Sequence, residues 1–246
     1  MSAPRWVAVI TEILERPENK KKFTSLLYQL ATVDAKNRPH VRTVGHHNFL
    51  LSKGAPHLPL LFGSTYTRSA KVQDIIANPS VELSWLIEGT SNQFRVSGRA
   101  FVVPSPDNKL FEECAQKMKR SLALAVLESQ GEEGKPEGEA FSWEALRLES
   151  FNSVPPTMRA KWCVADEPGT VLKSYEELSK YPVAVPPLER ATTEEQKKNW
   201  QEAFNNFALV VIEPYQVEWL QLDERPNRKT VWTKTDEDEW KEEIVL

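Results

Sequence analysis

The chain has 246 residues, 40% of them hydrophobic, and a formal net charge of −4 at pH 7. This length and apolar content suffice for one substantial core, and the slight acidity argues against a general nucleic-acid-binding surface. The two cysteines, without C-x-x-C spacing, exclude a disulfide framework and a cysteine-rich zinc site and favour a reducing compartment. No run of about 20 apolar residues occurs, so we expect a cytoplasmic protein without a membrane partner.

The first part of the chain predicts a helix followed by β-strands. Apolar residues recur at helical spacing from Trp6 to Leu14, so residues 4–16 should form an amphipathic helix lying over the sheet. Residues 25–34 and 39–51 are typical of a hairpin, and residues 58–63 supply the next strand. We expect these strands to begin an antiparallel sheet.

A hydroxyl-rich turn follows the third strand and leads into a short helix at 69–77, which stops at Asn78–Pro79. Arg68 and Lys71 lie among the oxygens of this turn, which are those of Ser64, Thr65, Thr67 and Ser69. The first turn of a helix exposes unpaired N–H groups, and beside two cations this arrangement suits a phosphomonoester. An ordinary capped helix with solvated charges is the alternative.

Alternating polarity then predicts two antiparallel strands, from Val81 to Trp85 and from Phe94 to Ala100, joined around residues 88–90. Gln93 lies at the mouth of the second strand. Its amide can offer both a donor and an acceptor to the edge of a heteroaromatic ring, or it is a half-exposed polar strand residue.

The rest of the chain predicts helices and a closing group of strands. Residues 106–129 should form one helix with an apolar face, and residues 142–149 a shorter one, separated by a charged loop. A further helix begins at Thr192 or Thr193, with Glu195 or Gln196 near the capping-box position. It leads into the expected strands, which are residues 206–213, 215–222 and 229–234.

Several short motifs occur in a fixed order. They are Arg42-Thr43-Val44, Thr67-Arg68-Ser69-Ala70-Lys71, Asn78-Pro79 and Gln93-Phe94-Arg95-Val96-Ser97-Gly98. This order resembles the FMN-binding split-barrel family related to pyridoxamine 5'-phosphate oxidase, in particular its less characterised branch. The sequence EPYQVEWLQLDERPNRKTVW resembles the closing strand pair of that family, a proline-led turn followed by a strand with Trp and an arginine-bearing hairpin. The resemblance covers about residues 24–104 and 204–244.

The resemblance implies a fold and an assembly. The fold is mainly β with peripheral helices, an antiparallel split barrel formed by residues 1–246 as a single domain with a helical and irregular insertion at about 105–205. The cofactor implied is FMN. The assembly implied is a homodimer that builds its flavin sites between subunits.

The resemblance also implies which residues bind FMN. The phosphate candidates are Arg68, Lys71 and Ser69, with Thr65 or Thr67. Arg42, in the segment with Thr43 and Val44, could reach the phosphate or the ring edge, or could be an exposed strand residue. Gln93 would bond the pyrimidine side of the ring. Trp219 and Arg228 match residues that approach the flavin from the other subunit, with Arg225 as a further candidate, although Trp219 could equally be plain packing.

The chain departs from the family pattern at His46 and His47, where apolar residues and a lysine are usual. Adjacent strand residues point to opposite faces, so at most one of these histidines can enter a site, and His47 is either a ring contact or a half-buried structural residue. Neither forms a metal set with the distant His40 or His57, so we expect no metal.

The function indicated is an FMN-dependent oxidoreductase acting on an unidentified small molecule, with no catalytic side chain assigned. The first alternative, oxidation of pyridoxamine or pyridoxine 5'-phosphate, is disfavoured because Asn227 lies near the place where that family has a histidine. Its other substrate-binding run is also not recognisable in residues 109–122. Two further alternatives are a non-catalytic flavin-binding protein and a scaffold that binds no flavin.

Overall fold

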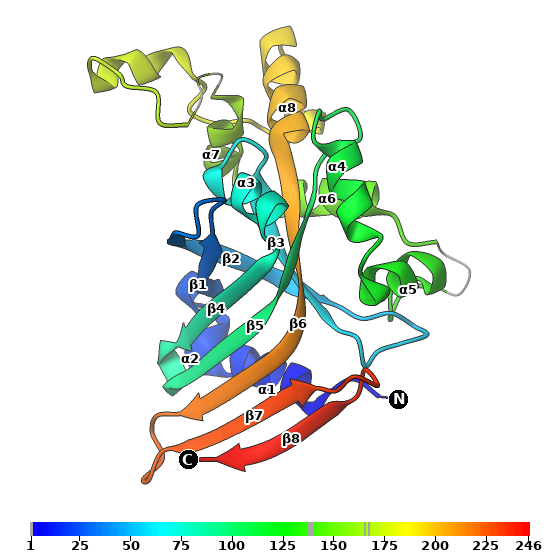
Figure 1. Cartoon of the computed structure of the whole chain (residues 1–246). Coiled ribbons are helices and arrows are strands. Elements are labelled where there is room, and N and C mark those ends of the chain that lie inside the picture. The colour runs from blue at the N-terminus through cyan, green and yellow to red at the C-terminus, as the bar shows by residue number, and fades with distance from the viewer. Residues whose placement is uncertain (1, 137–139, 165, 167) are drawn as a thin grey trace.

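A computed structural model describes residues 2–136, 140–164, 166 and 168–246 (Figure 1). Its strands form one antiparallel sheet in the order β3-β2-β1-β4-β5-β6-β7-β8, and β3 also pairs with β6. That pairing closes six strands into a barrel, while β7 and β8 extend the sheet beyond it. The expected antiparallel split barrel is therefore confirmed. The strands are β1 (Leu27–Val33), β2 (Pro39–Leu50), β3 (Leu60–Tyr66), β4 (Ser80–Ile87), β5 (Asn92–Val103), β6 (Phe207–Gln221), β7 (Arg228–Lys234) and β8 (Trp240–Val245).

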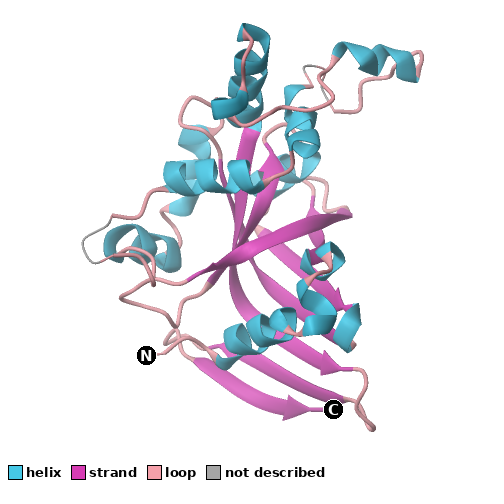
Figure 2. Cartoon of the chain, turned by 180° about the vertical axis from the view of Figure 1, so that it is seen from behind, coloured by secondary structure: helices cyan, strands magenta, loops and turns pink. Residues whose placement is uncertain are grey.

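The helix α1 (Arg5–Glu15) packs its apolar face into the barrel core, as its helical spacing predicts. Trp6 and Ile10 are fully buried, and the Trp6 ring lies 5.5 Å from that of Trp240 and 5.8 Å from that of Phe49. Figure 2 shows α1 and the short α2 (Pro17–Lys20) lying across the sheet. At the other end of the barrel, α3 (Ala70–Ala77) follows β3 and stops before Pro79, as expected.

A second core lies outside the barrel, under the 105–205 segment (Figure 1). Phe62 of β3 faces this outer core, whereas its neighbour Leu61 faces the barrel interior. The first half of β6 is buried on both faces, which explains its unbroken apolar sequence. The helical elements of the segment are α4 (Phe111–Met118), α5 (Leu122–Gln130), α6 (Trp143–Ser153), α7 (Pro156–Arg159), η3 (Ala160–Cys163), η4 (Tyr175–Lys180), η5 (Leu188–Arg190) and α8 (Glu194–Asn206).

The predicted single helix at 106–129 is wrong, because the chain forms α4 and α5 with a break between them. The hydroxyl of Ser121 accepts a hydrogen bond from the Leu124 N–H at 3.2 Å and so starts a new helix. Leu122, the first residue of α5, is exposed. The capping box of α8 is confirmed, with Thr193 as the cap and Gln196 as its partner.

The closing strands also differ from the prediction. Residues 206–213 and 215–222 belong to one strand, β6, and Pro214 lies inside it rather than in a turn. On one edge of β6, residues up to Ile212 pair with β3 and residues from Gln216 pair with β7. Pro214 lies between these two sets, so its missing N–H removes no hydrogen bond on that edge. The terminal strand β8 was not predicted. No helix of the described residues is long and apolar enough to cross a membrane.

Gly98 permits the close approach of β5 and β6 at an irregularity in their pairing, where Ser97 pairs with Gln216 but Gly98 pairs with Pro214. A Cβ at position 98 would lie 2.6 Å from the backbone oxygen of Glu213. The glycine that ends the Q-x-R-x-x-G motif is therefore required by the backbone of β6.

We predict that Gly98→Ala lowers the free energy of unfolding by about 1–3 kcal/mol, because neither backbone can move away cheaply. The matched control is Gly45→Ala, whose Cβ would meet its nearest atom at 4.0 Å. Urea unfolding of both variants measures the difference. Equal midpoints for the two variants would show that the contact at Gly98 relaxes without cost.

Candidate functional site

The turn between β3 and α3 brings together three of the predicted phosphate ligands. Ser69 occupies the N-cap position of α3, yet its hydroxyl makes no capping hydrogen bond. Instead, Ser69 Oγ lies 3.1 Å from Lys71 Nζ and 3.4 Å from Thr65 Oγ1. The N-terminal end of α3 thus presents two hydroxyls and an ammonium group beside backbone N–H groups that the side chain leaves unsatisfied.

The ammonium of Lys71 is half-buried and lacks a carboxylate partner among the described residues. Its hydrogen-bond partner there is the Ser69 hydroxyl. Loss of hydration, with a smaller contribution from the nearby charge of Arg42, lowers the pKa of Lys71 to about 8. A cation in this state is stabilised by any anion that can reach it.

Arg42 of β2 provides the second cation and is held by a buried network. Its Nη1 donates to Thr32 Oγ1 at 2.6 Å and to the backbone oxygens of Leu30 and His40 at 3.2 and 3.1 Å. Its Nη2 lies 3.4 Å from Asp74 Oδ2, and Thr32 Oγ1 donates to the same carboxylate oxygen at 2.7 Å. The carboxylate of Asp74 therefore pairs with Arg42, whereas the charge of Lys71 has no carboxylate partner among the described residues, which leaves a local excess of positive charge. We call Arg42, Thr65, Ser69 and Lys71 the α3 cluster.

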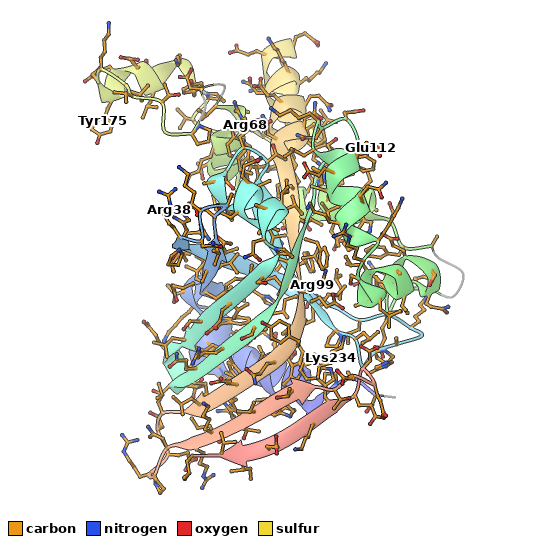
Figure 3. The ribbon with its side chains drawn as sticks, in the orientation of Figure 1. Arg38, Arg68, Arg99, Glu112, Tyr175 and Lys234 are labelled. Atoms are coloured by element: carbon orange, nitrogen blue, oxygen red, sulfur yellow. The ribbon has the colours of Figure 1, made fainter. Side chains whose placement is uncertain are left out.

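Arg68 and Thr67, which belong to the same 67–71 motif, lie outside the α3 cluster. Arg68 Nη2 donates to the backbone oxygen of Val164, to which the hydroxyl of Tyr66 also donates at 3.1 Å. The Arg68 guanidinium lies 4.9 Å from the centre of the Tyr66 ring. Figure 3 places Arg68 between α3 and the helices of the 105–205 segment. Thr67 is buried, and its hydroxyl has no hydrogen-bond partner among the described residues. Neither side chain joins the α3 cluster.

Gln93 and Thr43 lie on the outer face of the sheet. Phe94 and Val96 of β5 point into the barrel core, so Gln93 points outward, where its Nε2 lies 3.4 Å from Ser84 Oγ. Thr43 is likewise exposed, and its neighbour Val44 is buried in the core. Arg42 pairs in register with Leu30, a core residue, and so lies on the inner face. Within this chain, Gln93 and Arg42 are on opposite faces of the sheet.

Trp219 and Arg228 are also separate from the α3 cluster in this chain. The Trp219 ring stacks on those of Phe94 and Trp232 at 6.1 and 6.3 Å, and its Nε1 donates to Asn92 Oδ1 at 2.7 Å. Arg228 is exposed and pairs with Glu224 at 3.3 Å. The nearby Arg225 donates to the backbone oxygens of residues 222 and 224 and to the side chain of residue 227.

The two adjacent histidines point to opposite faces, as predicted. His46 lies in the barrel core, with ring centres 4.9 Å from Phe49 and 4.7 Å from Trp85, and burial lowers its pKa to about 3. His47 stacks on Phe62 at 5.6 Å on the outer side, and burial lowers its pKa as well. Both rings are therefore neutral at pH 7. No metal-binding group of histidine, cysteine or acidic residues occurs in the part of the chain that the structure describes.

Comparison with protein families adds the cofactor to this geometry. Residues 3–104 match the family model described as pyridoxamine 5'-phosphate oxidase, FMN-binding domain. The matched part of the chain is similar to that family, and the match spans less than half of the 246 residues. The cofactor of this FMN-binding domain is FMN. No curated protein matches the sequence.

Comparison with solved structures finds similar chains, of which the first shows the same fold. One is a pyridoxamine 5'-phosphate oxidase-related, FMN-binding protein from Nostoc punctiforme, with 23% identity, full coverage of both chains and a TM-score of 0.68. Another is PhzG from Burkholderia lata in complex with tetrahydrophenazine-1-carboxylic acid, with 13% identity and a TM-score of 0.49. That similarity covers 98% of this chain and 89% of PhzG.

The α3 cluster fits the phosphate of FMN. A phosphate dianion requires cations and N–H or O–H donors, and the cluster offers two cations, two hydroxyls and the start of a helix. The missing carboxylate partner of Lys71 is the observation that favours an anion here.

Sequence reasoning missed two members of the surrounding network, Thr32 and Asp74. Asp74 lies among Val72, Ile75 and Ile76 on the buried side of α3, where a carboxylate is unusual. That position was a usable signal, because a buried carboxylate requires a partner. The identity of the partners depends on the pairing of β1 with β2, which the sequence of α3 does not contain.

We predict that Lys71→Met changes how stability depends on pH in the protein without flavin. The unfolded chain binds a proton at Lys71 up to its ordinary pKa of 10.5, whereas the folded protein releases it at about 8. The free energy of unfolding of the wild type should therefore rise between these pH values relative to Lys71→Met. Urea unfolding across this range measures the rise, with Lys119→Met as an exposed control. Parallel curves for wild type and Lys71→Met would contradict the prediction.

Proposed function

We propose that the protein is an FMN-dependent oxidoreductase acting on a small molecule, with the FMN phosphate held by the α3 cluster. The observation that supports this most directly is the charge of Lys71, which lies near Arg42 and has no carboxylate partner among the described residues, while Asp74 pairs with Arg42. A phosphate dianion bound there would offset that excess charge, and the family of residues 3–104 is an FMN-binding one.

Each residue of the α3 cluster has a distinct role in this proposal. Arg42, fixed by backbone oxygens and Thr32, presents a guanidinium in a defined orientation, which suits two-point contact with phosphate. Lys71 contributes a compact charge, and bound phosphate would raise its pKa. Ser69 and Thr65 donate hydroxyl hydrogen bonds. When bound, FMN supplies hydride exchange at N5, while the protein orients the ring and the substrate.

The remaining predicted residues have supporting roles. Arg68 holds the 105–205 segment against the turn before α3 through Val164 and so positions the turn for phosphate binding. Thr67 stabilises the same turn through its backbone N–H, which donates to the Asn206 oxygen at 2.9 Å. In this arrangement the main phosphate ligands are Arg42, Ser69 and Lys71, and Arg68 acts through the turn.

We further propose that two copies of the chain form the complete flavin site. The outer face of β2, β1 and β4 exposes Val41 and Leu86, whose exposed fractions are 64% and 42%. In Figure 1 no helix covers β4 and the lower half of β5 on the side toward the viewer. A second copy packed on this face would bury these side chains and bring Gln93, with the hairpin that bears Trp219 and Arg228, toward a neighbouring α3 cluster.

A non-catalytic flavin-binding protein is the second candidate function. It shares the phosphate site but needs no access of a substrate to the ring, so turnover distinguishes it from an oxidoreductase. Assays of the FMN-loaded protein with pyridoxamine 5'-phosphate and with general electron donors and acceptors test this point. Turnover with any donor supports the oxidoreductase, and turnover with pyridoxamine 5'-phosphate would identify the vitamin B6 reaction.

We predict that Lys71→Met and Arg42→Met each weaken FMN binding roughly 10- to 100-fold, because charge-assisted hydrogen bonds contribute about 1.5–3 kcal/mol each. Binding of riboflavin, which lacks the phosphate, should change much less. Flavin fluorescence titration measures both, and Lys36→Met on the exposed β1–β2 turn is the charge-matched control. Equal losses for FMN and riboflavin would show that these cations do not contact the phosphate.

A mixing experiment tests the shared site. If Lys71 and Arg228 at one flavin come from different subunits, Lys71→Met and Arg228→Gln should each bind FMN weakly alone. Random mixed dimers should recover about a quarter of the wild-type sites, since half of the dimers are mixed and each holds one intact site. Light scattering establishes the dimer mass first. Recovery no greater than that of either variant alone would place both residues in one subunit or outside the site.

A further inference from the structure

We infer that a second anion site, separate from the α3 cluster, binds a small phosphomonoester between α3, β5 and α4. A cavity of about 130 Å³ lies there, between the C-terminal turn of α3, the second half of β5 and the end of α4. Three cationic side chains line it, Arg99 of β5, Lys117 of α4 and Arg120 just beyond α4. No acidic residue lines it. Figure 3 shows Arg99 on β5 near the middle of the molecule.

These cations have no other evident purpose in the fold. Among the described residues, no side chain forms a hydrogen bond or ion pair with the side chain of Arg99, Lys117 or Arg120. The Arg99 guanidinium lies 5.5 Å from the centre of the Phe101 ring, which restrains its position. Like charges that converge on one concavity repel each other, and an anion bound among them removes that repulsion.

The shape and lining of the cavity suit a phosphomonoester better than a free ion. Guanidinium groups match the geometry of phosphate oxygens and bind them in pairs. A cavity needs about 10–15 Å³ to hold one water, so this one has room for an oxyanion and part of its substituent. The apolar part of the wall, from Ile75, Ile76, Ala100 and Val102, offers contact to a short apolar or aromatic substituent.

The site is independent of the proposed flavin site. It lies at the C-terminal turn of α3, whereas Ser69 and Lys71 lie at the N-terminal turn, and a helix of eight residues is about 12 Å long. No residue of the α3 cluster lines the cavity. One molecule of FMN bound through the α3 cluster would leave the second site open.

The experiment titrates FMN-saturated protein with inorganic phosphate and with phenyl phosphate, followed by calorimetry. We expect phenyl phosphate to bind more tightly than phosphate, and Arg99→Gln and Arg120→Gln each to weaken it about 10-fold or more, because each removes a charge-assisted hydrogen bond. Lys109→Gln removes an exposed charge on the same chain segment outside the cavity and should change the affinity less than about 2-fold. Lys71→Met should leave this affinity unchanged.

Three results would overturn the inference. The first is the absence of saturable binding of either probe. The second is an equal loss in Lys109→Gln, which would indicate general attraction to a basic surface. The third is a loss in Lys71→Met without a loss in Arg99→Gln, which would place the probe at the α3 cluster. Because Arg120 is exposed, its replacement should not disturb folding, and its variant remains informative if Arg99→Gln misfolds.

Discussion

The pairing of β6 with three other strands is the constraint on which the rest of the structure depends. Over its first half β6 pairs with β3 and β5 and closes the barrel, and over its second half it pairs with β5 and β7 and extends the sheet. The change of partner occurs at Pro214, where β6 needs no donor on the open side. Gly98 on β5 lets the two backbones meet there, which links a short sequence motif to the closure of the whole barrel.

Barrel closure also fixes the chemistry at the end of β3. Because β3 is held between β2 and β6, the turn after it delivers Ser69 and Lys71 next to Arg42 of β2. Thr32 on β1 and Asp74 on α3 complete a buried network that orients the guanidinium. The network compensates the charge of Arg42 and leaves that of Lys71, so the fold retains a positive charge there that no described carboxylate offsets. In the proposed function, the stability lost by burying the charge of Lys71 is exchanged for affinity for phosphate.

Alternating polarity in the strands and breaking residues in the turns predicted an antiparallel sheet, and the family resemblance predicted its closure into a split barrel. The hairpin of β1 and β2, the end of α3 at Asn78–Pro79 and the cap of α8 at Thr193 all follow from local chemistry. The prediction failed where tertiary contacts override local signals. Pro214 is typical of a turn but lies within β6, and Ser121 divides an apolar run that predicts one helix.

The candidate site shows the same division between local and distant signals. Ser69 and Lys71 are close in sequence and in space, so the motif predicted their meeting. Arg68 directly precedes Ser69 in the sequence, yet its side chain donates to the backbone oxygen of Val164 in the 105–205 segment. No local sequence pattern predicts that contact. Thr32 and Asp74 come together only because β1 and α3 pack, and an apolar pattern cannot specify which polar pair that packing brings into contact.

The two ends of α3 differ in the sign of the charge that the helix dipole favours nearby. At the N-terminus, the helix dipole and the cations of the α3 cluster both favour an anion, so their effects add. At the C-terminus, the dipole itself is negative and satisfies part of the positive charge of Arg99, Lys117 and Arg120. A helix end is equivalent to only about half a unit charge, whereas these side chains provide three, so the dipole leaves most of that charge uncompensated. A dianion matches the remaining charge, so this end of α3 favours a phosphomonoester over a singly charged carboxylate.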